Sequence, residues 1–84
     1  MKFIRAKLYG QMTESKQQRA DSILKQAGVD LSQVEQTEVW DEGSETSLEA
    51  TFEFPVEDNQ VDRVSSEFRA IGFVVSQVER PSTE

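Results

Sequence analysis

The sequence predicts an α+β domain built from two successive strand–helix–strand units. Three observations favour this class. Apolar and polar residues alternate over residues 2–9 and 47–56, which is typical of strands with one buried face. Two further segments carry apolar residues at helical spacing. Each of these segments ends in a basic residue, then a glycine and then an apolar residue, as in "LKQAGV" and "FRAIGF", and this is a common helix ending.

The first unit starts with a strand over residues 2–9, in which every second side chain is apolar and faces a core. Gly10 ends this strand. Thr13 is the predicted N-cap of the following helix, because its hydroxyl can accept a hydrogen bond from a free backbone N–H of the first turn. Gly28 stands where helices commonly end in a residue with positive φ. We therefore expect a helix between Thr13 and Gly28.

Residues 34–40 and 47–56 are predicted to form two strands joined by a hairpin. Pro55 marks the end of the hydrogen-bonded ladder of the second strand. The connection "DEGSE" contains Gly43, which can supply the positive φ of a turn. Its three carboxylates lack the spacing of a calcium-binding loop. A turn is therefore the preferred interpretation, and we predict no metal site.

The second helix is expected to begin with a cap at Glu57 or Asp58 and to end before Gly72. A last strand follows over residues 73–79, although its alternation does not decide which side faces the core. We expect a single domain over residues 1–80, followed by a flexible tail at residues 81–84.

The resulting order, β-α-β-β-α-β, is that of the ferredoxin-like plait. Right-handed crossovers then place both helices on one face of a four-stranded antiparallel sheet with strand order 4-1-3-2. The other face is left open to solvent or to a partner. The two edge strands leave unpaired backbone groups, which predicts a homodimer formed through the sheet edges.

The chain has no histidine and no cysteine. It therefore lacks the commonest general base and the commonest metal ligands. The sequence contains no paired-carboxylate motif, no glycine-rich phosphate loop and no nucleophile elbow. We predict that the protein is not an enzyme, and we predict no catalytic residue and no cofactor. A charged N-terminus and the absence of a long apolar run predict a cytoplasmic protein without a membrane segment.

The charge of the chain is strongly polarised. The net charge is −7, and no Lys or Arg lies between Lys25 and Arg63, an interval that holds eleven acidic residues. Such a charge argues against direct binding of nucleic acid, whose affinity for proteins comes largely from Lys and Arg. It favours a basic protein surface as the partner.

On the open face, we expect Arg5 and Lys7 of the first strand to lie across from Glu49 and Glu53 of the third. Opposite charges at facing positions stabilise a sheet and fix its register. RNA-binding domains of this fold carry aromatic residues where Glu49 and Glu53 stand, so the open face is not predicted to bind RNA.

Trp40 is the predicted anchor of a contact surface, because tryptophan buries a large area at interfaces and keeps one polar group. With Thr37 and Val39 assigned to the helix side, Glu38 and Trp40 are expected on the open face. The alternative is that Trp40 folds over its own sheet edge and closes the core. The predicted partner-binding residues are Trp40, Glu38, Asp41, Glu42, Glu45, Glu57 and Asp58.

The run "ILKQAGVDLSQVEQT … LEATFEFPVEDNQVDRVSSEFRAIGFVVSQVE" resembles the ACT-type regulatory domains. The resemblance covers about two-thirds of the chain and rests on general features of the fold. It implies a non-catalytic domain that pairs with a second copy and binds an amino acid, using the loop after the first strand. The matching loop residues are Gly10, Gln11, Met12 and Thr13. They depart from the acidic residue and Pro-Gly pair that are usual in that family.

The sequence thus leaves three functions open. The first is a non-catalytic protein–protein interaction or regulatory module that uses the acidic surface. The second is a dimeric domain that senses an amino acid or another small molecule. The third is an acidic inhibitor that occupies the nucleic-acid groove of a basic enzyme by imitating its substrate.

Overall fold

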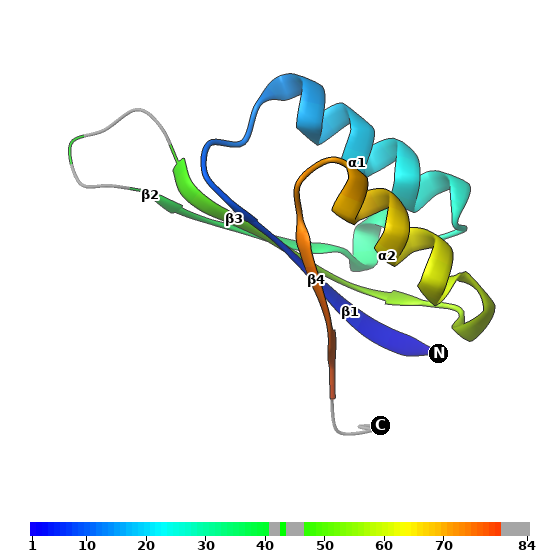
Figure 1. Cartoon of the computed structure of the whole chain (residues 1–84). Coiled ribbons are helices and arrows are strands. Elements are labelled where there is room, and N and C mark those ends of the chain that lie inside the picture. Colours follow the sequence, from blue (N-terminus) through cyan, green and yellow to red (C-terminus); the bar gives the residue numbers. More distant parts are fainter. Residues whose placement is uncertain (41–42, 44–46, 80–84) are drawn as a thin grey trace.

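Four strands form one antiparallel sheet, and two helices cover one of its faces (Figure 1). The computed structural model describes residues 1–40, 43 and 47–79. The predicted tail, residues 81–84, lies outside the described residues. None of the helices in the described part of the chain is long and apolar enough to span a membrane. The elements are β1 (Lys2–Tyr9), α1 (Glu14–Gln26), η1 (Leu31–Gln33), β2 (Glu35–Trp40), β3 (Ser47–Val56), η2 (Asp58–Gln60), α2 (Val61–Ala70) and β4 (Val74–Val78).

The sheet has the order β2-β3-β1-β4. This is the predicted order read from the opposite edge, so the prediction of a four-stranded antiparallel sheet with two helices is confirmed. β1 lies in the middle and pairs with β3 on one side and with β4 on the other. β2 and β4 are the edge strands.

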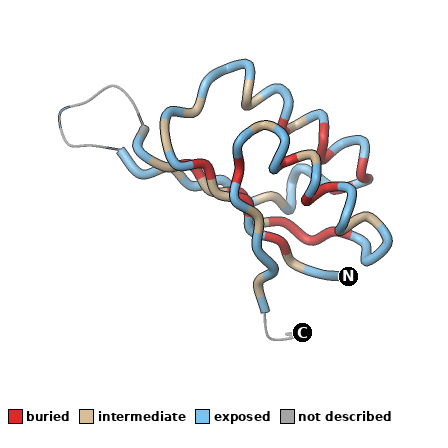
Figure 2. The backbone as a smooth tube through the Cα atoms, in the orientation of Figure 1, coloured by how far each residue is buried: buried red, intermediate tan, exposed pale blue. Residues whose placement is uncertain are grey.

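The core lies between the helices and the sheet (Figure 2). β1 contributes small and medium side chains to it, whereas β3 contributes Phe52 and Phe54. Phe68 of α2 packs on these rings and on Phe73, with ring centroids 5.6 Å from Phe54 and 5.2 Å from Phe73. This aromatic cluster holds α2 against the sheet.

The ends of α1 are formed by the residues that the sequence predicts. The hydroxyl of Thr13 accepts a hydrogen bond of 3.1 Å from the backbone N–H of Lys16. At the other end, the N–H of Gly28 donates to the carbonyl of Lys25, and the N–H of Val29 donates to the carbonyl five residues before it. This pair of bonds is the Schellman motif, and it satisfies carbonyls that the helix itself leaves free. The same two bonds close α2 around Gly72.

The start of α2 differs from the prediction. A 3-10 turn, η2, separates Glu57 from the first residue of α2, Val61. No side-chain hydrogen bond caps η2 at Glu57 or α2 at Gln60. The prediction that Glu57 or Asp58 caps this helix is therefore wrong, because the short turn moves the first helical residue beyond the reach of both carboxylates.

Candidate functional site

The register of β2 against β3 reverses the predicted orientation of β2. Gln36 and Glu38 are paired with Phe52 and Ala50, whose side chains point into the core. Directly paired residues share a face, so Gln36 and Glu38 lie on the helix side. Gln36 also exchanges two amide hydrogen bonds with Gln17 of α1, at 2.7 and 3.2 Å. The prediction that Glu38 faces the open side is wrong, because neither side of β2 is apolar enough to show its orientation in the sequence.

Four large apolar side chains are exposed at the end of the sheet where β2 leaves for the hairpin. Trp40 is 52% exposed, Tyr9 is 63% exposed, and Val39 and Leu48 are each 50% exposed. Val39 and Tyr9 are both paired with Glu49, one on each side of β3, so they share the open face. The backbone carbonyl of Leu48 accepts a hydrogen bond of 2.8 Å from the N–H of Gly10, just after the end of β1.

Leu48 alternates with Glu49 along β3, so its side chain lies on the helix-side face, opposite to Tyr9 and Val39. We refer to Tyr9, Val39, Trp40 and Leu48, which are exposed at this end of the sheet, as the sheet-end patch. This end of β2 and β3 extends past the helices in Figure 1. Trp40 is not among the side chains that pack against the core, so the structure does not support the alternative in which it closes the core. A register shift between Val39 and Trp40 bends the ladder at this point. Sequence reasoning found Trp40 but missed the other three residues, because only the pairing of the strands places all four at one end of the sheet.

Glu57 and Asp58 do not share a surface with Trp40. Glu57 and Asp58 follow the last residue of β3, whereas Trp40 is paired with its first residue, Ser47. A strand of ten residues is roughly 30 Å long, so the two groups lie at opposite ends of the sheet. The carboxylate of Asp58 lies 3.1 Å from the amino group of Met1. The other predicted contact residues, Asp41, Glu42 and Glu45, lie outside the described residues.

The central acids of the open face are neutralised by β1, as predicted. Arg5 Nε lies 2.7 Å from a carboxylate oxygen of Glu53, and Lys7 Nζ lies 3.2 Å from one of Glu49. Lys7 Nζ also lies 5.3 Å from the centre of the Tyr9 ring. Exposed pairs of this kind contribute about 0–1 kcal/mol each. The middle of the open face is therefore polar and close to neutral, and Tyr9 and Val39 of the sheet-end patch are its apolar border.

The pKa of the Asp30 carboxyl is lowered from its ordinary value. The hydroxyl and the backbone N–H of Ser32 donate hydrogen bonds of 2.8 and 3.0 Å to the carboxylate of Asp30, and they lower its pKa. Among the described residues, no group of three or more His, Cys, Asp or Glu side chains is arranged to hold a metal ion. The perturbed carboxylate is therefore a local cap of η1.

We expect Ser32→Ala to raise the pKa of Asp30 towards its ordinary value of about 4, because the hydroxyl hydrogen bond is the largest cause of its lowering. A lowered pKa in the folded state stabilises the fold above the unfolded-state pKa, and this contribution is lost as the pH falls through the folded-state pKa. The loss of stability in Ser32→Ala should thus be present at neutral pH and shrink below about pH 4. An NMR titration of the Asp30 carboxyl measures the pKa. An unchanged pKa would contradict the assignment.

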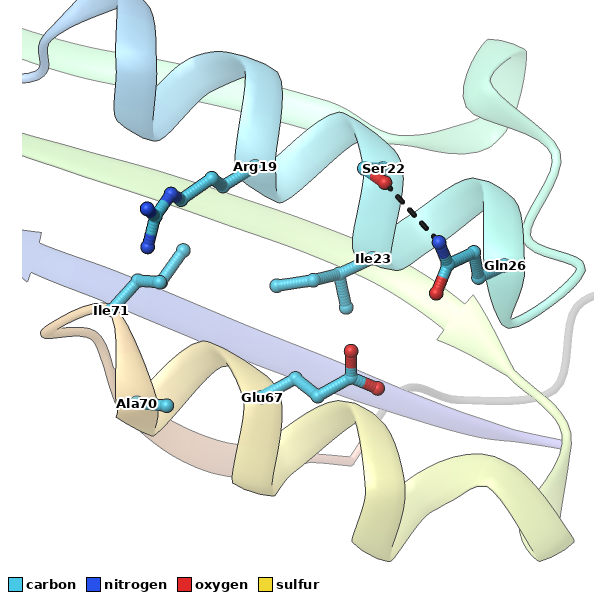
Figure 3. A pocket seen from close by; sticks show the side chains of 7 residues that line it. All are labelled: Arg19, Ser22, Ile23, Gln26, Glu67, Ala70 and Ile71. Atoms are coloured by element: carbon cyan, nitrogen blue, oxygen red, sulfur yellow. Dashed lines mark hydrogen bonds between the residues drawn. The ribbon is translucent and has the colours of Figure 1, made fainter.

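A groove of about 320 Å³ runs between α1 and α2 on the outer side of the helical layer. Figure 3 shows the side chains of Arg19 and Glu67 reaching into it from opposite helices. Glu67 is paired with Arg63 at 3.0 Å. No ion pair links Arg19 to an acid in the described part of the chain. The residues lining the groove are Arg19, Ser22, Ile23, Gln26, Glu67, Ala70 and Ile71.

The predicted ligand-binding loop, Gly10 to Thr13, lies next to this groove. Met12 is half-buried against the core, Gln11 is exposed, and Gly10 continues the backbone ladder of β1. Thr13 lines a second groove, which shares Arg19, Ala70 and Ile71 with the first. The structure thus brings this predicted loop residue to a concave surface.

Comparison of the chain with models of known protein families gives no match. A search of curated proteins gives no significant match either.

Proposed function

We propose that this protein is a non-catalytic module that acts by contact with another protein through the sheet-end patch. The observation that carries this proposal is the exposure of four large apolar side chains at one end of the sheet. Large apolar side chains that are exposed together at one end of a small domain commonly mark an interaction site. Two β-α-β units with both helices on one face support a ferredoxin-like plait, whose open face and sheet ends are free for such contacts.

The charges around the patch favour a partner with a basic rim. β2 and β3 contain four acidic residues and no Lys or Arg. Two of these acids, Glu49 and Glu53, are paired with β1, and Glu38 is the acid of β2 that lies nearest to the patch. A partner with an apolar pocket for Trp40 and basic side chains around it fits this surface. Its binding would weaken with ionic strength, because exposed charges are screened by salt.

We expect Trp40→Ala to weaken binding to the partner at least about tenfold, because a half-exposed tryptophan at the centre of an interface is a typical hot spot. The same change should lower the free energy of unfolding by less than about 1 kcal/mol, since Trp40 is not packed in the core. Binding is measured by biolayer interferometry against a partner captured by the wild-type protein, and stability is measured by urea unfolding.

Leu31→Ala is the matched control. Leu31 is also an exposed large apolar residue, at 38%, but it lies in η1, before the start of β2 and away from the sheet-end patch. We expect it to leave binding unchanged. If Leu31→Ala and Trp40→Ala weaken binding equally, the contact is non-specific and the proposal fails.

A second candidate function is the binding of an anionic small molecule, such as the carboxylate of an amino acid, in the groove at the start of α1. The observation that favours it is that Thr13, Lys16 and Arg19 line one groove, and neither cation forms an ion pair within the described residues. Thermal unfolding with each amino acid tests it. A shift that Arg19→Ala abolishes supports binding, and a melting temperature that no amino acid changes excludes it.

A further inference from the structure

The outer edge of β4 lacks the features that normally keep an edge strand from pairing. Its five residues, VVSQV, include no charged side chain. The other edge strand, β2, contains Glu35 and Glu38 and a register shift. Charges and bulges are common means by which proteins protect sheet edges. We infer that β4 pairs antiparallel with β4 of a second copy, which gives a homodimer with one continuous sheet of two times four strands.

A two-fold axis through Ser76 gives a register without repulsive neighbours. Val74 then lies opposite Val78 of the second copy, on the open face, because both residues share that face with β1. Val75 lies opposite Gln77 on the helix side. Each cross-strand pair is therefore apolar or neutral, and the residue on the axis is a small serine that is exposed in the single chain.

The helical layer also fits this arrangement. α2 packs over β1 and β4, so the axis of this helix lies between the two strands, about half a strand spacing from β4. The two-fold axis of the dimer lies on the other side of β4, half a spacing from it and midway between the two β4 strands. With strands about 4.8 Å apart, the two α2 helices are about 10 Å apart. Packed helices commonly lie 8–10 Å apart, so the second α2 closes the groove that β4 and α2 border.

The charges on this side of α2 are complementary across the axis. Asp62, Ser65 and Arg69 line the groove together with β4. Ser65 lies five residues before the end of α2 at Ala70, and Ser76 lies two residues after the start of β4 at Val74. These lengths are each about 7–8 Å, so Ser65 and Ser76 are level with each other on the two sides of the turn. Asp62 and Arg69 are on either side of Ser65. The two-fold axis therefore places Asp62 of one copy next to Arg69 of the other copy, and Arg69 of the first next to Asp62 of the second. Neither forms an ion pair within the described part of one chain.

The first test is the mass in solution. Light scattering should give about twice the 9.5 kDa of one chain for the wild type. Ser76→Lys should give a single-chain mass with an unchanged circular dichroism spectrum, because it places two lysines together on the axis. Thr37→Lys makes the same kind of change at an exposed position of β2 and should remain dimeric. A wild-type mass of one chain at all concentrations, or dissociation by Thr37→Lys alone, overturns the inference.

The second test uses the ion pairs. Asp62→Arg and Arg69→Asp should each weaken self-association at least tenfold, because each creates two like-charged contacts. An equimolar mixture of these two variants should form a dimer again, since each contact then joins an arginine of one variant to an aspartate of the other. A mixture that stays monomeric contradicts the proposed register. Trp40 lies in the opposite edge strand, so Trp40→Ala should leave the dimer intact and separates this inference from the proposed function.

Discussion

Phe68→Ala should lower the free energy of unfolding by about 3–5 kcal/mol, the range that is typical for truncating a buried phenylalanine. Phe68 is 0% exposed, and its ring contacts the rings of Phe52, Phe54 and Phe73. These neighbours come from β3 and from the turn before β4, so the ring joins α2 to both sides of β1. The cavity left by alanine cannot close by moving one flexible side chain, because three rings border it.

The size of this effect relative to the whole fold makes it decisive. A domain of 84 residues has a total stability of roughly 4–13 kcal/mol. The variant should therefore be only marginally folded at 25 °C. Urea unfolding followed by circular dichroism measures the change. The fluorescence of Trp40 is a poor probe, because this side chain is already half exposed in the folded protein.

Trp40→Ala is the control for this measurement. Both substitutions remove one aromatic ring, but only that of Phe68 is enclosed by core residues. A loss of less than about 1 kcal/mol in Phe68→Ala would contradict the arrangement of α2 on the sheet. A loss of several kcal/mol in Trp40→Ala would assign Trp40 to the core and remove the basis of the sheet-end patch.

The sequence predicts the order of the elements and the strand order because their signals are local. Thr13, Gly28 and Gly72 each determine a helix end through the conformation or hydrogen bonds of one residue. The alternation in β1 and β3 shows directly which side is buried, since one side is apolar and the other is charged. The right-handed crossover rule then leaves few ways to connect the strands.

The orientation of β2 could not be predicted in the same way. One side of β2 carries Gln36 and Glu38, and the other side carries Thr37 and Val39. Hydrophobicity therefore favours the wrong side as the one that faces the helices. The pairing with β3 and the hydrogen bonds from Gln17 decide the orientation, and both depend on tertiary structure. On this edge strand, a polar residue on the helix side is tolerated because an amide from α1 forms hydrogen bonds with it.

The separation of Glu57 and Asp58 from Trp40 could have been found from the sequence. The strand length of β3 alone places these two acids roughly 30 Å from Ser47, which is paired with Trp40. The sheet-end patch could not have been found, because Tyr9 and Leu48 stand in alternating strands where both look like ordinary strand residues. Tyr9 is exposed because it lies on the open face, whereas Leu48, on the helix side, is exposed because the helices end before the sheet does (Figure 1).

Gly72→Val should lower the free energy of unfolding by about 1–3 kcal/mol, because Gly72 has a φ of +100°, which a β-branched residue adopts only with strain. Space is not the cause, since the nearest atom to an added Cβ is a methyl carbon of Leu8 at 3.8 Å, an ordinary contact. The strain acts on the two hydrogen bonds that close α2. These bonds hold Phe73 against Phe68, with ring centroids 5.2 Å apart, so the substitution weakens the motif and the core together.

Gly28 offers the matched comparison for this prediction. It closes α1 with the same two hydrogen bonds, but its φ is +79°, nearer to the left-handed region that asparagine tolerates. Asparagine should therefore cost less at Gly28 than at Gly72, when both variants are compared by urea unfolding. Equal costs at the two positions would show that the loss of a helix-ending glycine, and not the backbone angle, sets the penalty. A larger cost at Gly72 would assign the difference to its φ, since an added Cβ meets no close neighbour at either position.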